Sequence, residues 1–267
     1  MTTRPPVLRQ LRPRSERLHW PRGPLPSLDR VAFREALLTV MDGKTHWAWP
    51  AFESGRVPRE RLNRHFEQEW DVWVRDLSVL FGRAHAQCPV PEVRREIAAR
   101  LYEEETGGIC AGRPHSQLFL EIARGLGMEL SRFESVTRGP AAQTFRDLLD
   151  ECTTIRGWAV ALAVSTLFLD GRAPERHIFD PEAPAPSEPT LDAHPLVVHY
   201  GIATACLALV GAHRALARDR RRTTWRMVID HTPEEDRRAV VASLRQVRNA
   251  WLMYRDEVAY GSGLTRS

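Results

Sequence analysis

Residues 101–119 read LYEEETGGICAGRPHSQLF and hold the helix boundary from which the fold is best read. Three glutamates precede Gly107 and Gly108, which end one helix, and Pro114 begins the next. Negative side chains at a helix C-terminus oppose the helix dipole, so stability alone does not favour them there. A nearby positive charge resolves this conflict, and a metal ion is one candidate.

Helical patterns continue on both sides of this boundary, and strand-like alternation is nowhere convincing. The apolar spacing and the glycine and proline signals predict helices over about 27–43, 45–53, 58–88, 91–106, 114–126, 140–169, 191–218 and 233–259. The sequence therefore predicts an all-α, single-domain bundle of about seven helices. The domain covers 27–259, after an extended basic N-terminal arm (1–26) and before a C-terminal tail (260–267).

The charge of the chain does not by itself indicate a nucleic-acid partner. The 267 residues carry a formal net charge of +4, and all but one of the 38 basic side chains are arginines. Such a skew is typical of arginine-rich codon usage. The cluster Arg218, Arg220, Arg221 and Arg222 lies between two helical patterns without interleaved aromatics, so we expect a solvated loop there.

Neither a membrane span nor export is expected. The longest nearly apolar run, from Trp158 to Leu169, is far shorter than the roughly 20 residues of a spanning helix. Residues 1–30 lack the apolar region of a secretory signal. The four cysteines are widely spaced and are interpreted as reduced thiols. These features predict a cytoplasmic protein.

In an all-α bundle, a cofactor site is built from acids and histidines that point inward. Glu69 stands among the apolar positions Phe66 and Trp73, although an edge position suits it equally well. Counting back from Glu105 reaches an apolar set that includes Tyr102, so Glu105 is placed on an inward face. Both glutamates are therefore candidate metal ligands.

Two histidines and two weaker candidates complete the set. His115 opens the helix after the glycine loop, where a cap or an ordinary core histidine is the alternative. His199 lies in the apolar segment 195–210 and needs a hydrogen-bond or metal partner. Asp170 and Cys206 are the weaker candidates. Asp170 is equally typical of an ordinary helix end, and Cys206 of a small buried hydrophobic residue.

These pieces resemble a known group of proteins. Residues 46–62 (HWAWPAFESGRVPRERL) resemble the opening motif of the heme-oxygenase-like superfamily, which includes thiaminase II, pyrroloquinoline-quinone synthase C and the heme-oxygenase-like di-iron oxidases. Residues 101–108 and 113–119 resemble the di-iron branch, in which a glutamate, a glycine-bearing loop and a histidine follow one another. The resemblance covers about 28–258.

The resemblance implies a ligand set for Fe(II), namely Glu69, Glu105, His115, Asp170 and His199, with Tyr102 as a supporting neighbour. The family's His-x-x-x-Asp-x-x-His set is altered, because Ala203 and Cys206 stand where its aspartate and second histidine would follow His199. Cys206 remains a possible ligand. One or two ions are implied, and we expect one firmly bound iron and at most one labile ion.

The resemblance also implies a function. It predicts a non-heme iron oxidase or oxygenase that uses O2 on an amino acid, an amine, a fatty acid or a related biosynthetic intermediate, in natural-product biosynthesis and as a homodimer. Two alternatives stay open. One is a metal-free, cofactorless oxidase like pyrroloquinoline-quinone synthase C, and the other is a non-catalytic partner of an active homologue.

Overall fold

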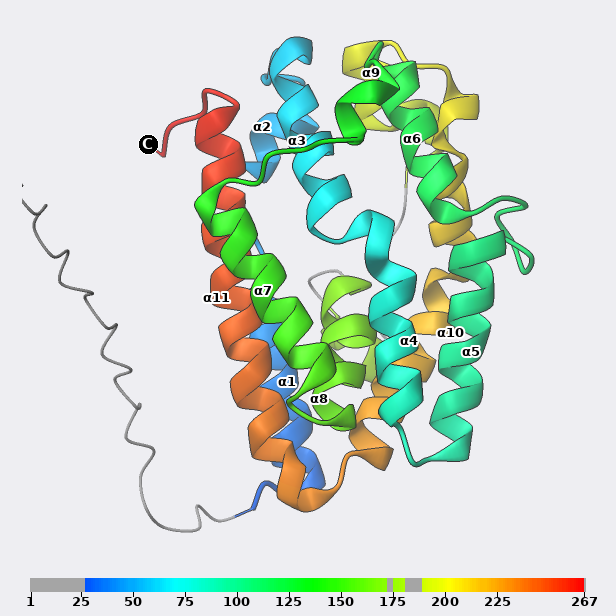
Figure 1. The fold of residues 1–267 in the computed structure, drawn as a ribbon, viewed down its shortest axis with the longest axis vertical. Helices are drawn as coiled ribbons and strands as arrows, with labels where there is room; N and C mark the ends of the chain where they lie inside the picture. The colour runs from blue at the N-terminus through cyan, green and yellow to red at the C-terminus, as the bar shows by residue number, and fades with distance from the viewer. Residues whose placement is uncertain (1–26, 172–174, 181–188, 267) are drawn as a thin grey trace, which may run out of the picture.

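The computed structural model describes residues 27–171, 175–180 and 189–266, and within them every regular element is helical. The predicted all-α fold is thus confirmed. Figure 1 shows an elongated bundle, with α1, α7 and α11 along one side and α4, α5 and α10 along the other. None of the described helices combines the length and apolarity that a membrane crossing requires. The predicted arm, 1–26, lies outside the described residues.

Eleven α-helices make up the described bundle. They are α1 (Arg30–Asp42), α2 (Trp49–Glu53), α3 (Arg59–Val72), α4 (Leu77–Gln87), α5 (Pro91–Thr106), α6 (His115–Gly125), α7 (Pro140–Thr154), α8 (Trp158–Leu162), α9 (Pro195–Tyr200), α10 (Ala208–His231) and α11 (Arg237–Gly261). A π-helical segment, η3 (Ala163–Leu169), continues α8. Short 3₁₀ turns are η1 (Val74–Asp76), η2 (Leu130–Phe133), η4 (Arg176–Phe179), η5 (Leu191–Ala193), η6 (Thr204–Leu207) and η7 (Glu234–Asp236).

The helices outnumber the predicted seven because three long predicted helices are divided. The first breaks at Trp73, whose φ of −153° leaves the helical region. The other two break at Gly157 (φ +90°) and Gly201 (φ +66°), in a backbone region that only glycine enters without strain. Each break redirects the chain, so residues on either side of it do not share one helix face.

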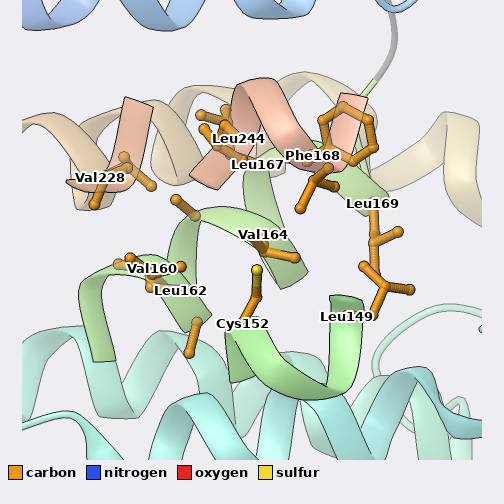
Figure 2. Close-up of a cluster of buried hydrophobic side chains, with 14 of the residues drawn as sticks. Leu149, Cys152, Val160, Leu162, Val164, Leu167, Phe168, Leu169, Val228 and Leu244 are labelled. Carbon is orange, nitrogen blue, oxygen red and sulfur yellow. The ribbon is translucent and has the colours of Figure 1, made fainter. Parts of the chain in front are cut away.

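The main hydrophobic core surrounds α8 and the π-helical segment. Figure 2 shows their side chains meeting those of α7, α10 and α11, with Val164 and Leu167 in the interior. A helix that is apolar on every side must be enclosed on every side, which explains the central position of this segment. A second apolar cluster lies among α2, α3, α6 and α9.

The C-terminus of the π-helical segment is bound by Lys44. Its ammonium group donates hydrogen bonds to the carbonyls of Phe168 and Gly171 and lies 4.6 Å from the centre of the Phe168 ring. Burial, followed by the charge of Arg221, lowers the pKa of Lys44 to about 7. Lys44 thereby ties the loop after α1 to the segment that ends at Asp170.

The arginine cluster predicted to form a solvated loop lies instead inside α10, which runs on to His231. Arg221 is an interior group: it pairs with Glu175 at 2.6 Å and donates to the carbonyls of Thr166 and Leu167. The prediction of a loop is wrong because α10 continues through these residues, and Arg220 and Arg221 have acidic or carbonyl partners inside the bundle. A run of arginines can therefore continue a helix.

Candidate metal centre

The last turn of α5 and the first turn of α6 face each other across the glycine loop. The buried positions of α5 include Ile97, Arg100 and Glu103, so the inward face passes on to Glu104, four residues after Arg100. Gly107 ends the helix with a φ of +66°, and a Cβ there would lie 2.2 Å from a backbone oxygen. This close approach lets the loop turn back sharply.

Three side chains from three helices meet at this point. Glu104 of α5, His115 of α6 and His213 of α10 each offer a ligand atom, and these atoms lie within 4.8 Å of one another. The Glu104 and His115 side chains are 9% and 5% exposed. The two imidazole rings are 5.1 Å apart at an interplanar angle of 65°. Among the described residues, this is the one cluster of acids, histidines and cysteines with such spacing.

The spacing of these ligand atoms suits a shared metal ion better than a direct hydrogen bond between the side chains. His115 Nδ1 lies 3.0 Å from Glu104 Oε1, yet this buried nitrogen has no partner with hydrogen-bond geometry. Two atoms that bind one ion at about 2.1 Å stand about 3 Å apart, as these do. Two imidazoles and one carboxylate are the ligand set of mononuclear non-heme Fe(II) oxygenases.

Glu103 orients the imidazole of His115 from the other side. Its Oε1 lies 3.2 Å from His115 Nε2, and its carboxylate accepts backbone N–H groups of Ile109, Cys110 and Ala111 at 2.7, 3.1 and 3.0 Å. Burial alone would raise the pKa of Glu103, but these hydrogen bonds hold it below its usual value. With Nε2–H donating to Glu103, Nδ1 keeps its lone pair for a metal.

Charged neighbours surround the cluster on the side of Asp170. Arg100 Nη1 lies 2.8 Å from Asp170 Oδ2, and Arg220 Nη1 lies 3.8 Å from Glu104 Oε1. Burial would raise the pKa of Asp170, but Arg100 and then Arg221 lower it to about 2. Asp170 is therefore an anion held by a guanidinium group, at the end of the π-helical segment.

The structure places Glu105 away from the site. It is exposed and shares a side of α5 with Tyr102, which is 55% exposed and rests against Gly108. Each residue of a helix turns the side chain by about 100°, so Glu104 and Glu105 cannot both face inward. The apolar residues around Tyr102 predict the wrong inward face of α5. Glu104 takes the inward position that was expected for Glu105.

Glu69 is buried as expected but lies in another cluster. Its carboxylate accepts a hydrogen bond from Tyr254 Oη, lies 2.8 Å from Arg255 Nη1 and accepts Trp73 Nε1 at 3.1 Å. Burial would raise the pKa of Glu69, but Arg255 and then His65 lower it. This carboxylate is fully occupied by protein partners, and the structure does not bring it together with His115.

His199, Ala203 and Cys206 do not line the site together. α9 ends at Tyr200, directly before Gly201, and both His199 and Ala203 are exposed. Cys206 lies in η6 with its side chain against Gly125. The predicted continuous helix fails at Gly201, whose left-handed backbone ends the helical turn.

Sequence reasoning missed His213, the histidine that does reach the site. It stands seven residues, or about two helical turns, after Cys206 in the same apolar pattern. A single helix that begins near residue 191 predicts His199 as the inward histidine. A break at Gly201 would have pointed to His213.

Comparisons with known proteins concern the fold and one part of the chain. The profile of a family described as iron-containing redox enzymes matches residues 64–177, somewhat less than half of the chain. The crystal structure of a TenA homolog from Pseudomonas syringae pv. tomato str. DC3000 superposes with a TM-score of 0.64 at 9% identity, covering 88% of this chain and 97% of the other. No curated protein matches the sequence significantly. The chain has the heme-oxygenase-like fold, and its residues 64–177 are similar to the iron-containing redox enzymes.

Proposed function

We propose that this chain is a mononuclear non-heme iron enzyme that uses O2 to oxidise a small molecule. The observation that carries the proposal is the convergence of Glu104, His115 and His213 from three helices on one buried point. The match to iron-containing redox enzymes supports iron as the metal. Relative to the sequence prediction, Fe(II) and O2 are kept, while Glu104 and His213 replace Glu105 and His199 as ligands.

The chain's own residues have distinct tasks in this proposal. Iron, when bound, supplies O2 binding and electron transfer at coordination positions that three protein ligands leave open. Glu104, His115 and His213 hold it, and Glu103 fixes the ring of His115. The low exposure of Glu104 and His115 keeps bulk water away from the reacting atoms.

The substrate and setting are carried over from the superfamily resemblance. We propose an amino acid, an amine, a fatty acid or a related intermediate of natural-product biosynthesis as substrate, and a cytoplasmic homodimer as the working form. Neither nucleic acid nor a membrane has a part in this proposal.

Metal analysis with a matched pair of variants tests the proposal. Protein purified without chelator is loaded with Fe(II) under anaerobic conditions, and bound iron and O2 consumption are then measured. We expect His213→Gln to lose bound iron, and His199→Gln, which changes an exposed histidine, to keep it.

Two results would contradict the proposal. If the wild-type protein binds no iron, the metal-free oxidase or the non-catalytic partner accounts better for the chain. If His199→Gln loses iron as fully as His213→Gln, the assignment of ligands to the described cluster fails.

A further inference from the structure

Two interior arginines beside the proposed iron site have carboxylates of their own. Arg100 donates to Asp170 at 2.8 Å and to Thr224 Oγ1 at 2.5 Å. Arg221 donates to both oxygens of Glu175, at 2.8 and 2.6 Å. The charge and the hydrogen-bond donors of these two guanidinium groups are therefore used within the protein.

Arg220, between them in the fold, differs from both. The carboxylate oxygen that its guanidinium group approaches is Glu104 Oε1, at 3.8 Å, which is too far for a hydrogen bond. Within the described part of the chain, no side chain or carbonyl accepts a hydrogen bond from this group. The side chain is nevertheless only 14% exposed. A largely buried cation with unused N–H donors indicates a place for an acceptor that the chain itself does not supply.

The position of Arg220 is fixed by its neighbours. Its backbone carbonyl accepts Arg100 Nη2 at 3.2 Å and Thr224 Oγ1 at 2.8 Å. It follows His213 by seven residues, or about two helical turns, so the two residues share one side of α10. Long side chains of a helix lean toward its N-terminus, and Arg220 accordingly reaches back to Glu104, beside His213. The guanidinium group thus faces the proposed ligands.

The ligand cluster is most open on this same side. His213 is half-buried, whereas Glu104 and His115 are buried. Arg220 and His213 therefore lie on the side of the cluster from which we expect a small molecule to approach.

Metal binding changes the charge balance at Arg220. Without a metal, the carboxylate of Glu104 partly compensates the guanidinium charge across 3.8 Å. A divalent ion bound by Glu104 takes up that negative charge, and Arg220 is then a largely buried cation without a counter-charge, which is unfavourable. An anionic group of a ligand restores the balance. A planar carboxylate matches the guanidinium group best, because it accepts two parallel hydrogen bonds.

We infer that Arg220 binds the carboxylate of the substrate and holds it beside the proposed iron ligands. The inference rests on the proposed function and narrows its substrate class. Amino acids, fatty acids and other carboxylic acids fit, and amines without an acidic group do not. Because the acid is held at one end, the carbon atoms next to it are the ones that face the metal site.

Ligand pairs that differ in the acidic group test the inference without an assay of activity. Protein loaded anaerobically with Co(II) is titrated by calorimetry with octanoate against octylamine and octan-1-ol, and with leucine against isoamylamine. We expect at least one of the two acids to bind at least about tenfold more tightly than its counterparts, as a charge-assisted pair of hydrogen bonds requires.

Variants of α10 separate binding by Arg220 from direct binding to the metal. Arg220→Gln removes only a long contact, so it should keep the metal ion but lose the preference for the acid. Arg220→Lys keeps the charge without the two parallel donors and should retain part of that preference. The matched control is Arg226→Gln, which changes an exposed arginine of the same helix and should bind both metal and acid as the wild type does.

The outcomes distinguish this inference from the proposed function. If the metal-loaded wild type does not prefer the acids, or if Arg220→Gln keeps the preference, the inference is wrong and the iron site stands. Loss of the metal ion by Arg220→Gln would assign a structural role to this side chain and would also overturn the inference. A wild type that binds no metal would overturn the proposed function, and the inference with it.

Discussion

Glu69 and Glu104 are buried acids on α3 and α5, and their surroundings differ completely. Glu69 is bonded by Arg255, Tyr254 and Trp73, so every direction open to its carboxylate already has a donor. Glu104 faces two imidazoles and only a distant guanidinium. Burial on an apolar face therefore does not distinguish a structural ion pair from a metal ligand. The two kinds of site are distinguished by the partners that other helices bring to the carboxylate, which are hydrogen-bond donors at Glu69 and imidazoles at Glu104.

The cluster around Glu69 is also closed by aromatic rings. The guanidinium of Arg255 lies about 5 Å from the ring centres of Trp49, Trp251 and Tyr254. Such contacts stabilise a cation in a nearly dry environment and fix its position. This region is a completed ion pair, in which the buried Nε of Arg255 is left without a hydrogen-bond partner.

The largest expected effect is on the stability that the Glu69–Arg255 ion pair provides. Glu69→Gln leaves the buried charge of Arg255 without its counter-ion, and we expect the free energy of unfolding to fall by about 3–5 kcal/mol. Urea denaturation measures this change. Metal binding by the folded fraction should remain, so loss of iron without loss of stability would reverse the roles assigned to the two glutamates.

The converse substitution is at the proposed metal site. Glu104→Gln should lower Fe(II) affinity at least about 100-fold, or about 2.7 kcal/mol, because one charged ligand of three is removed. Anaerobic titration measures the affinity. Glu105→Gln alters the adjacent, exposed position and should leave the affinity unchanged. Equal effects of the two substitutions would contradict the inward assignment of Glu104.

The pH dependence of stability sharpens the comparison on the side of Glu69. Burial lowers the pKa of His65 to about 4, against an ordinary value of 6.5. The unfolded chain therefore binds a proton that the folded chain rejects between these values, and stability falls as pH drops from about 6.5 to about 4.

Replacing His65 with phenylalanine removes this contribution. We expect the wild type to lose about 2 kcal/mol more than His65→Phe between pH 7 and pH 4.5, measured by urea denaturation at each pH. His199→Phe, at an exposed histidine, serves as the control. Parallel stability curves for wild type and His65→Phe would show that His65 is not held neutral.

The smallest expected effect concerns the group behind the metal ligand. Glu103→Gln weakens the acceptor that orients His115, and we expect Fe(II) affinity to fall about tenfold. The same anaerobic titration measures it. A loss larger than that of Glu104→Gln would indicate that Glu103, rather than Glu104, is the coordinating carboxylate.

The sequence was sufficient for the helical class, for the end of α5 at Gly107 and for the start of the next helix at His115, because local signals determine all three. It was not sufficient to choose among three consecutive glutamates. A shift of one residue turns a helix face by about 100°, and Tyr102 and Leu101 made the face of Glu105 read as apolar. Only the packing of α6 and α10 identifies Glu104.

The two errors in the last third of the chain have a common cause. The apolar pattern predicts that the helix continues through Gly201, but the helix ends there. The inward histidine is therefore His213 and not His199. The local pattern predicts solvated arginines in α10 because the acidic partners of Arg220 and Arg221, Glu104 and Glu175, are distant in sequence. Pairing across the fold is not visible in a single local pattern.

Lys44 is the one lysine in the sequence, and its amine is enclosed by the carbonyls that end the π-helical segment. Acylating reagents can reach this side-chain amine only when the loop after α1 separates from that segment. Burial is the main cause of the low pKa of Lys44, so once the loop opens the pKa returns toward the ordinary value of 10.5 and the amine reacts as an exposed lysine does. The rate of acylation at Lys44 therefore measures how often the structure opens locally beside Asp170, and mass spectrometry can follow it at this single position.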